Sequence, residues 1–253
     1  MNHRLKKFQL AAVFLFLIAL NASAWGQPSF FSEANSKYQA GDFKGAADLY
    51  QKIIASGNAT SAVYYNLGNA TLRLGHKGEA LVYYERALRG APRDKDLKWN
   101  IRVLQSALPD LIEESSPHWL QGWIENATAF WRLDEIGFLF TAVLAFGTLL
   151  ALLNYLFPGI RGILMSLRFP VFLILLASLV LFGLKWYDTK DERVVILDKE
   201  VSAYYGPSDK EAKAFVLHEG AEGKIMDSSR DWFYVALKNK NTGWIPKTSC
   251  EII

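Results

Sequence analysis

Few side chains of the kinds that carry out chemistry occur in this chain, and they are scattered. The single cysteine is Cys250, so neither an intramolecular disulfide nor a cysteine-ligated zinc site can form. No histidine lies at metal-ligand spacing from another; the four are His3, His76, His118 and His218. Ser228, Ser229 and Asp231 lie close together, but without a neighbouring histidine they indicate a turn. We therefore expect no catalytic residues, no metal and no cofactor, and a protein that binds rather than an enzyme.

The composition favours membrane segments and argues against nucleic acid as a partner. The 253 residues are 51% hydrophobic and 21% charged, with a formal net charge of +3. The apolar residues are concentrated in long runs, which is typical of membrane segments rather than of one large core. Positive and negative charges are mixed throughout the chain, so no basic stripe is available to follow a phosphate backbone.

The first 24 residues have the pattern of a signal peptide. Arg4, Lys6 and Lys7 precede an apolar run over 8–20, and Ala22-Ser23-Ala24 follows as a small-x-small site. We expect cleavage after Ala24; the alternative is an uncleaved signal anchor. In both cases the residues that follow lie outside the cytoplasm, because the basic end stays inside.

Two further apolar runs, 136–157 and 169–187, predict transmembrane helices. Each is long enough to cross a hydrocarbon core of about 30 Å at about 1.5 Å per residue. Lys185 is the single charge in the second run, next to Trp186 and Tyr187, as expected at a membrane interface. The segment 158–168 carries Arg161 and Arg168 but no acid, which favours a cytoplasmic loop. Two spans would then place the C-terminus outside.

A repeat with a period of 34 residues lies within 27–94, and together with one further helix it makes up a predicted domain over 27–108. Gly41 recurs as Gly75, Ala46 as Ala80 and Tyr50 as Tyr84. This is the period of the tetratricopeptide repeat (TPR), in which each unit is two antiparallel helices. The stretch from Tyr64 to Pro92 resembles the TPR consensus, with one departure at Lys77, where the family has an aromatic residue.

The residue types fit a stack of two repeats closed by a capping helix. Gly68 and Ala80 are small where helices must cross closely, and Gly75 permits positive φ at a helix end. A third helix over 94–108 is expected to cap the array. We expect Trp99 and Val103 to supply its apolar face, together with Ile101 and Leu104.

The first helix of each TPR unit lines a concave groove, which places a set of polar residues where a partner segment would bind. These candidate groove residues are Asn35, Asn66, Asn69, Arg73 and Asn100. Asn35 and Asn66 match the asparagines of carboxylate-clamp TPRs, although the basic partners of that clamp are absent. The simpler alternative, which we favour, is that Asn66 and Asn100 form hydrogen bonds between adjacent helices.

The linker 109–135 contains an amphipathic segment over 119–133. Its apolar residues share one helical face: Trp119, Trp123, Ile124, Ala127, Phe130 and Trp131. This pattern predicts an interfacial helix on lipid. The alternative is a helix packed against the repeats.

After Arg193 the pattern changes to short strands and turns. We expect strands at 194–197, 201–205, 214–217, 223–227, 232–238 and 242–246. In the fifth, Phe233, Val235 and Leu237 share one face. Such short strands over 194–253 favour a small all-β barrel.

Four motifs of 194–253 resemble those of bacterial SH3-like (SH3b) domains. They are Tyr205-Gly206-Pro207-Ser208, His218-Glu219-Gly220, Trp232 followed by Tyr234-Val235, and Thr242-Gly243-Trp244-Ile245. Some members of that family bind cell-wall peptides, and Tyr205, Trp232 and Trp244 could form an aromatic face for such a ligand. The alternative, which we favour, is that these aromatics belong to the barrel core.

The order of these segments resembles the TPR proteins of the Bat aerotolerance operon, the BatE family. The segment from Tyr65 to Ala70, the segment from Tyr83 to Leu88, and His218-Glu219-Gly220 carry the likeness. The resemblance implies an envelope complex with von Willebrand A-domain membrane proteins, under a MoxR-type ATPase, and a part in oxygen and stress tolerance.

The sequence thus predicts a multidomain membrane protein: an all-α TPR array, two transmembrane helices and an all-β SH3-like barrel. We expect a scaffold of the bacterial inner membrane with both folded modules in the periplasm, in contact with protein partners and membrane lipid. The alternative is an envelope sensor that binds peptidoglycan through the SH3-like domain.

Overall fold

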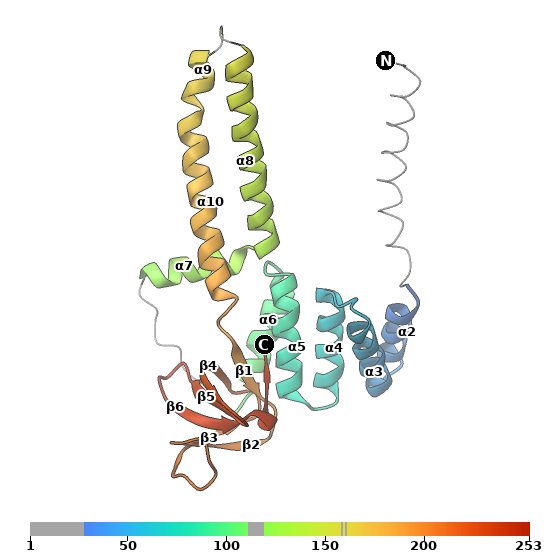
Figure 1. The fold of residues 1–253 in the computed structure, drawn as a ribbon. Coiled ribbons are helices and arrows are strands. Elements are labelled where there is room, and N and C mark those ends of the chain that lie inside the picture. Colours follow the sequence, from blue (N-terminus) through green and yellow to red (C-terminus); the bar gives the residue numbers. More distant parts are fainter. Residues whose placement is uncertain (1–27, 111–118, 158, 160) are drawn as a thin grey trace. The chain divides into compact units, whose positions relative to one another are not determined.

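The computed structural model describes residues 28–110, 119–157, 159 and 161–253. The predicted signal peptide and its cleavage point lie outside the described residues, as does part of the predicted cytoplasmic loop. The chain divides into two compact units whose boundary falls between Ala59 and Thr60. Within the described residues, the protein combines helices with one antiparallel sheet (Figure 1).

The first unit is a helical hairpin of α2 (Pro28–Gln39) and α3 (Phe43–Ala55). The turn between them requires Gly41, whose φ is +84°, a conformation that L side chains rarely adopt. Asp42 caps α3 by accepting a hydrogen bond from the amide of Gly45 at 2.8 Å. Ala34 and Ala46 are fully buried, so the hairpin packs closely through small residues.

The second unit begins with a hairpin of the same construction, α4 (Ser61–Arg73) and α5 (Lys77–Gly90). Gly75 has a φ of +91° in the connecting turn, the same role that Gly41 has in the first unit. At Gly68 a side chain would come within 2.6 Å of the ring of Tyr84, which confirms the expected close helix crossing. Thr60 caps α4 by accepting from the amide of Val63.

The next helix, α6 (Lys95–Ser106), corrects part of the sequence prediction. Ile101 and Leu104 are buried as expected, together with Leu97, but Trp99 is 60% exposed and Val103 is 48% exposed. The prediction for Trp99 and Val103 was wrong because α6 carries two apolar stripes. The positions of α5 and of the sheet decide which stripe is covered.

Two long apolar helices lie side by side, α8 (Leu133–Leu156) and α10 (Arg168–Asp188) (Figure 1). Both are long and apolar enough to cross a membrane, judged by length and composition. Asp134 and Glu135, directly before the predicted first span, lie in the first turn of α8. The short helix α9 (Arg161–Ser166) precedes α10, and α7 (Trp119–Phe130) precedes α8.

The C-terminal part forms one seven-stranded antiparallel sheet, in the order β3-β2-β6-β5-β4-β1-β7. Its strands are β1 (Arg193–Ile196), β2 (Glu200–Tyr204), β3 (Lys213–His218), β4 (Glu222–Ser229), β5 (Trp232–Ala236), β6 (Thr242–Pro246) and β7 (Cys250–Ile252). Six of them correspond to the predicted strands. The sequence prediction missed β7, because a strand of 3 residues is too short to show an alternating pattern.

The sheet curls around its own core. Val194 and Ile196 of β1, near one end of the strand order, share a buried cluster with Leu217 of β3 at the other end. Val235 in the centre of β5 is fully buried in the same cluster. A flat sheet could not bring its two ends to one cluster, so the strands must coil.

Candidate binding surfaces

The predicted groove asparagines of the two hairpins have a structural role that repeats. In the first unit the hydroxyl of Tyr50 donates to Asn35 Oδ1 at 2.6 Å. In the second unit the hydroxyl of Tyr84 donates to Asn69 Oδ1 at 2.7 Å. The two pairs lie at the same offset as the sequence repeat. Asn35 and Asn69 therefore join the two helices of their own hairpins.

The remaining predicted groove residues lie in the second unit. Asn100 on α6 donates through Nδ2 to the hydroxyl of Tyr65 on α4 at 2.8 Å, which confirms the inter-helix alternative for this residue. Asn66 is half-buried and Arg73 is exposed, and their spacing of seven positions puts them on one stripe of α4. The exposed Trp99 and Val103 of α6 are additional surface residues that the sequence prediction had assigned to the core.

An aromatic face forms on the outer surface of the sheet, where Trp232, Tyr234 and Trp244 are half-buried. Trp232 and Tyr234 alternate along β5 with Phe233 and Val235, which face the core, so they point to the other side. Our preference for core positions was therefore wrong for Trp232 and Trp244, and also for Tyr205, which is largely exposed.

Contacts across three strands hold this face together. Tyr234 and Trp244 are opposite each other on β5 and β6, with ring centroids 5.2 Å apart. Tyr204 of β2 lies opposite Trp244 and makes an edge contact with Trp232 at 5.7 Å. Tyr205 follows with 71% of its surface exposed. Such rings offer an apolar body and a polar edge, as binding surfaces commonly do.

Two members of this aromatic face, Tyr204 and Tyr234, were not among the residues predicted from the sequence. The period-2 pattern of β5 contained the signal for Tyr234, because inward Phe233 and Val235 require an outward Tyr234. In β2 the inward Val201 and Ala203 likewise put Tyr204 on the outer side, but its neighbour Trp244 lies on a strand that is distant in sequence.

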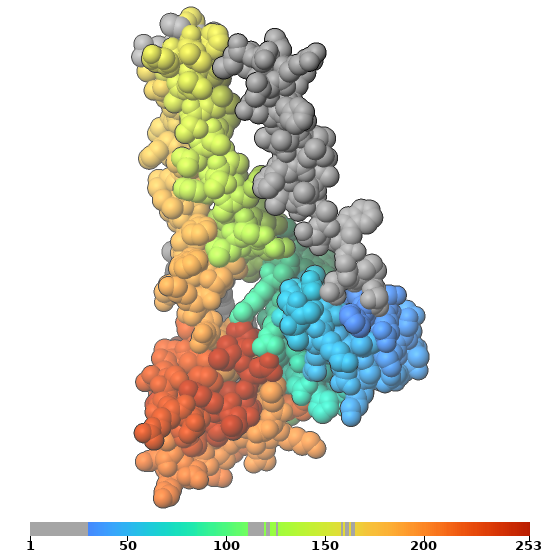
Figure 2. Space-filling view, turned by 45° about the vertical axis from the view of Figure 1, so that its right-hand side comes forward, coloured from blue at the N-terminus to red at the C-terminus, as the bar shows by residue number. Residues whose placement is uncertain are grey.

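The sheet is joined to the second hairpin and α6 through a shared apolar core. One buried cluster contains Leu81 and Tyr84 of α5, Leu97 and Leu104 of α6, and Val195 of β1. Ile253, after the last strand, belongs to the same cluster. In the space-filling view the C-terminal residues, drawn in dark red, lie against this helical part (Figure 2). The helices α4 to α6 and the sheet thus form one head, and we use this name for them below.

Polar contacts border this core, and two of them come from the end of β3 and the turn that follows it. Glu219 Oε1 accepts from the amide of Gly78 at 2.8 Å, in the first turn of α5. The residue before α5, His76, makes no side-chain cap, so Glu219 provides one from the sheet. The amide of His218 donates to Asp110 Oδ2 at 2.7 Å, and its ring Nδ1 lies 2.9 Å from Oδ1 of the same carboxylate.

Two glycines permit this close approach. A Cβ on Gly78 would lie 2.6 Å from the carbonyl oxygen of Ile196. A Cβ on Gly220 would lie 2.5 Å from the side chain of Leu108, and the φ of Gly220 is +84°. At Gly78 the helix backbone meets the backbone of β1, so an added Cβ would clash there. At Gly220 the backbone meets the side chain of Leu108, and the positive φ further disfavours a larger residue.

Two acidic side chains and one arginine lie at the edge of the shared core. Glu85 of α5 and Glu222 of β4 are 12% and 11% exposed, and each lies 3.8 Å from the guanidinium of Arg193. Gln105 Nε2 donates to Glu222 Oε1 at 2.7 Å. Burial, and then the neighbouring Glu222, raise the pKa of Glu85, and Arg193 offsets this rise only in part.

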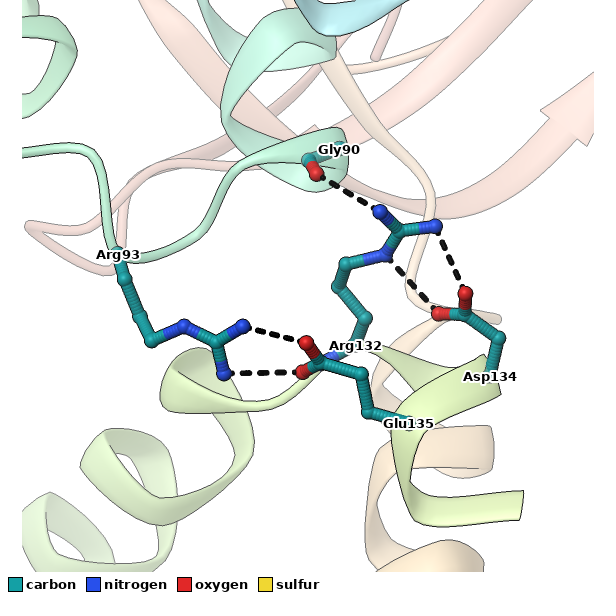
Figure 3. A network of polar contacts seen from close by, with 5 residues as sticks. All are labelled: Gly90, Arg93, Arg132, Asp134 and Glu135. Atoms are coloured by element: carbon teal, nitrogen blue, oxygen red, sulfur yellow. Dashed lines mark hydrogen bonds and ion pairs between the residues drawn. The ribbon is translucent and has the colours of Figure 1, made fainter. Parts of the chain in front are cut away.

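A polar network connects the end of α5 to the start of α8 (Figure 3). Arg93 donates through both terminal nitrogens to the carboxylate of Glu135, with one distance of 3.0 Å. Arg132 donates to the carbonyl of Gly90 at 3.2 Å and pairs with Asp134 at 2.8 Å. The Gly90 contact satisfies a carbonyl at the C-terminus of α5, where cations are favoured.

The lone cysteine has the environment of a structural residue. Cys250 is half-buried against the core of the sheet, and burial raises the pKa of its thiol to about 11. Among the described residues, no three His, Cys, Asp or Glu side chains gather in a way that could hold a metal ion.

No model of a known protein family matches the chain, and comparison with curated proteins finds no match either.

Proposed function

We propose that this protein is a non-enzymatic scaffold of the bacterial inner membrane, whose TPR-type repeats and SH3-like sheet bind protein partners. The observation that carries this proposal is the shared core between α5, α6 and β1. It holds the polar stripe of α4 and the aromatic face of the sheet in a fixed relation on one head. When a common partner binds one of these two surfaces, the other surface is held nearby, so its effective concentration for the same partner rises.

The repeated Asn–Tyr hydrogen bond supports the TPR assignment, because the same contact recurs at the period of the sequence repeat. A curled antiparallel sheet with one small core supports the SH3-like assignment. The resemblance to the BatE family names the partners: von Willebrand A-domain membrane proteins under a MoxR-type ATPase, in a complex for oxygen and stress tolerance.

Site-specific crosslinking in intact membranes tests the partner. A photoreactive amino acid at Asn66 or Arg73 is expected to crosslink a von Willebrand A-domain protein, whereas the same probe at exposed Thr248 is not. Equal crosslinking at all three positions, or none with any such protein, would contradict the proposal.

The orientation is tested by alkaline phosphatase fused after residue 110 and after residue 253. We propose that α8 and α10 cross the membrane with both flanking parts in the periplasm, so both fusions should be active. Inactive enzyme at both positions would overturn this orientation.

A second candidate function, an envelope sensor that binds peptidoglycan, is favoured by the aromatic face on the outer side of the sheet. Retention of the full chain on purified murein sacculi tests it, with Trp244→Ala as the variant and Phe172→Ala, in α10, as the matched control. Retention that Trp244→Ala abolishes would favour the sensor. Retention that is absent, or the same in both variants, would exclude the aromatic face as a murein site.

A further inference from the structure

The helix α7 presents an aromatic stripe on one side and packs on the other. Trp119 and Trp123 are each 74% exposed and Phe130 is 48% exposed, and spacings of four and eleven put all three on one face. Asn126, also exposed, continues this stripe. On the opposite side Thr128 is only 4% exposed, and α7 contacts α10. The aromatic stripe is thus the exposed side of α7, opposite the side that carries Thr128.

The C-terminal end of α10, the helix that α7 contacts, also carries exposed aromatic side chains. Trp186 is 49% exposed and Tyr187 is 69% exposed, at the end of the helix. Lys185 pairs with Asp188 at 3.2 Å, and Lys190 Nζ lies 5.4 Å from the Trp186 ring. Aromatic rings accompanied by lysines are typical of the boundary between hydrocarbon and water.

We propose that the α7 stripe and the end of α10 form one aromatic collar, defined by Trp119, Trp123, Phe130, Trp186 and Tyr187, that binds the surface of the lipid bilayer. This inference rests on the proposed placement of α8 and α10 in the membrane. The occupant is lipid because α7 is followed by α8 after only two residues, Trp131 and Arg132. A helix so close to the start of a span lies at the headgroup level.

The arginine network then holds the head at the surface of the bilayer. Arg93, in the connection between α5 and α6, pairs with Glu135 in the first turn of α8. Its guanidinium also lies 5.3 Å from the ring of Phe130 and 5.9 Å from that of Trp131. The same side chain therefore joins the head, the collar and the first apolar helix.

Lipid quenching of a fluorescent probe tests this inference on the full chain in phosphatidylcholine–phosphatidylglycerol vesicles. In a Cys250→Ala background, Asn126→Cys places an environment-sensitive dye on the stripe without removing an aromatic ring. Phe138→Cys in α8 is the membrane control, and Thr248→Cys on the head is the aqueous control. Quenching by headgroup-level spin-labelled lipid is expected to be several-fold stronger at 126 than at 248.

The outcomes separate this inference from the proposed function. Quenching at 138 without quenching at 126 would leave the spans in the membrane and overturn the collar. No quenching at 138 would overturn both, because α8 would not lie in lipid. Adding Trp123→Asp to the 126 probe is expected to reduce its quenching, since a charge resists entry to the boundary; unchanged quenching would overturn the role of the stripe.

Discussion

Glu219 accepts a hydrogen bond from the backbone amide of Gly78 at 2.8 Å, although the two residues lie on opposite sides of both apolar helices in the sequence. The contact caps the N-terminus of α5 with a carboxylate that belongs to the sheet. Because the helix N-terminus carries partial positive charge, the negative side chain is favoured there. The β3–β4 turn thus completes a helix of the repeat array.

Removing this cap is expected to loosen the first turn of α5. Glu219→Ala should lower the local opening free energy by about 1 kcal/mol, the usual effect of losing a cap. Glu219→Gln keeps an acceptor oxygen and should have a smaller effect. Hydrogen exchange at the amides of α5 measures both, with exposed Glu200→Ala as the control. Equal exchange in all three variants would show that the contact does not stabilise α5.

The close approach at Gly78 gives a prediction opposite to the usual helix rule. Within a helix, Gly→Ala commonly stabilises by about 1 kcal/mol. Gly78→Ala should instead destabilise, by roughly 1–3 kcal/mol, because its Cβ would meet the Ile196 carbonyl at 2.6 Å. Gly137→Ala in α8 is the control, since nothing lies within 4 Å of its added Cβ. Thermal unfolding in detergent compares them, and a Gly78→Ala protein as stable as the parent would contradict the close packing.

The buried acid Glu85 should make the head less stable as pH rises. Its pKa is raised in the folded protein, so its contribution to stability is fully present below the ordinary carboxyl pKa. That contribution is lost as the pH increases through the raised value. In the Glu85→Gln variant, the free energy of unfolding is expected to depend less on pH above about 4.5 than it does in the parent. Glu79→Gln is the control, and identical pH profiles for Glu85→Gln and the parent would refute the prediction.

The repeated tyrosine hydroxyls should contribute equally in the two hairpins. Tyr50→Phe and Tyr84→Phe each remove one hydrogen bond to an asparagine and should each cost about 0.5–1.5 kcal/mol. Denaturant unfolding measures this cost, with the 71% exposed Tyr205 as the site of a Tyr→Phe control. A large cost in one hairpin and none in the other would argue against equivalent repeats.

The arginine network should fix the distance between the head and α8. Arg93→Gln removes the paired bonds to Glu135 and the contact with Phe130, so the head is expected to sample a wider range of positions. Spin labels at Arg102 and Phe138 measure this as a broader distance distribution, with exposed Lys95→Gln as the control. Arg93→Lys should restore the distribution only in part, because an ammonium cannot make two parallel bonds to one carboxylate. An unchanged distribution in Arg93→Gln would rule out this role.

Features that depend on one short segment of the chain could be predicted from the amino-acid sequence. The alternation of Phe233, Val235 and Leu237 specified a strand and its inner face. The glycines at 41 and 75 marked turns that need positive φ, and the apolar runs over 136–157 and 169–187 specified two long helices. In each case the physical cause is local, since periodicity, backbone freedom and uninterrupted hydrophobicity act along one segment.

Which of two similar surfaces becomes buried could not be predicted from the sequence, because it depends on the packing of distant elements. Leu97 and Trp99 are both apolar residues of α6, yet one is buried and the other is 60% exposed. Likewise, the short segment β7 is a strand because it pairs with β1. Glu219 caps α5, a helix that is far from it in the sequence. These outcomes depend on partners brought together by the shared core. An apolar side chain gains free energy when it is buried, but only the fold provides the surface against which it can be buried.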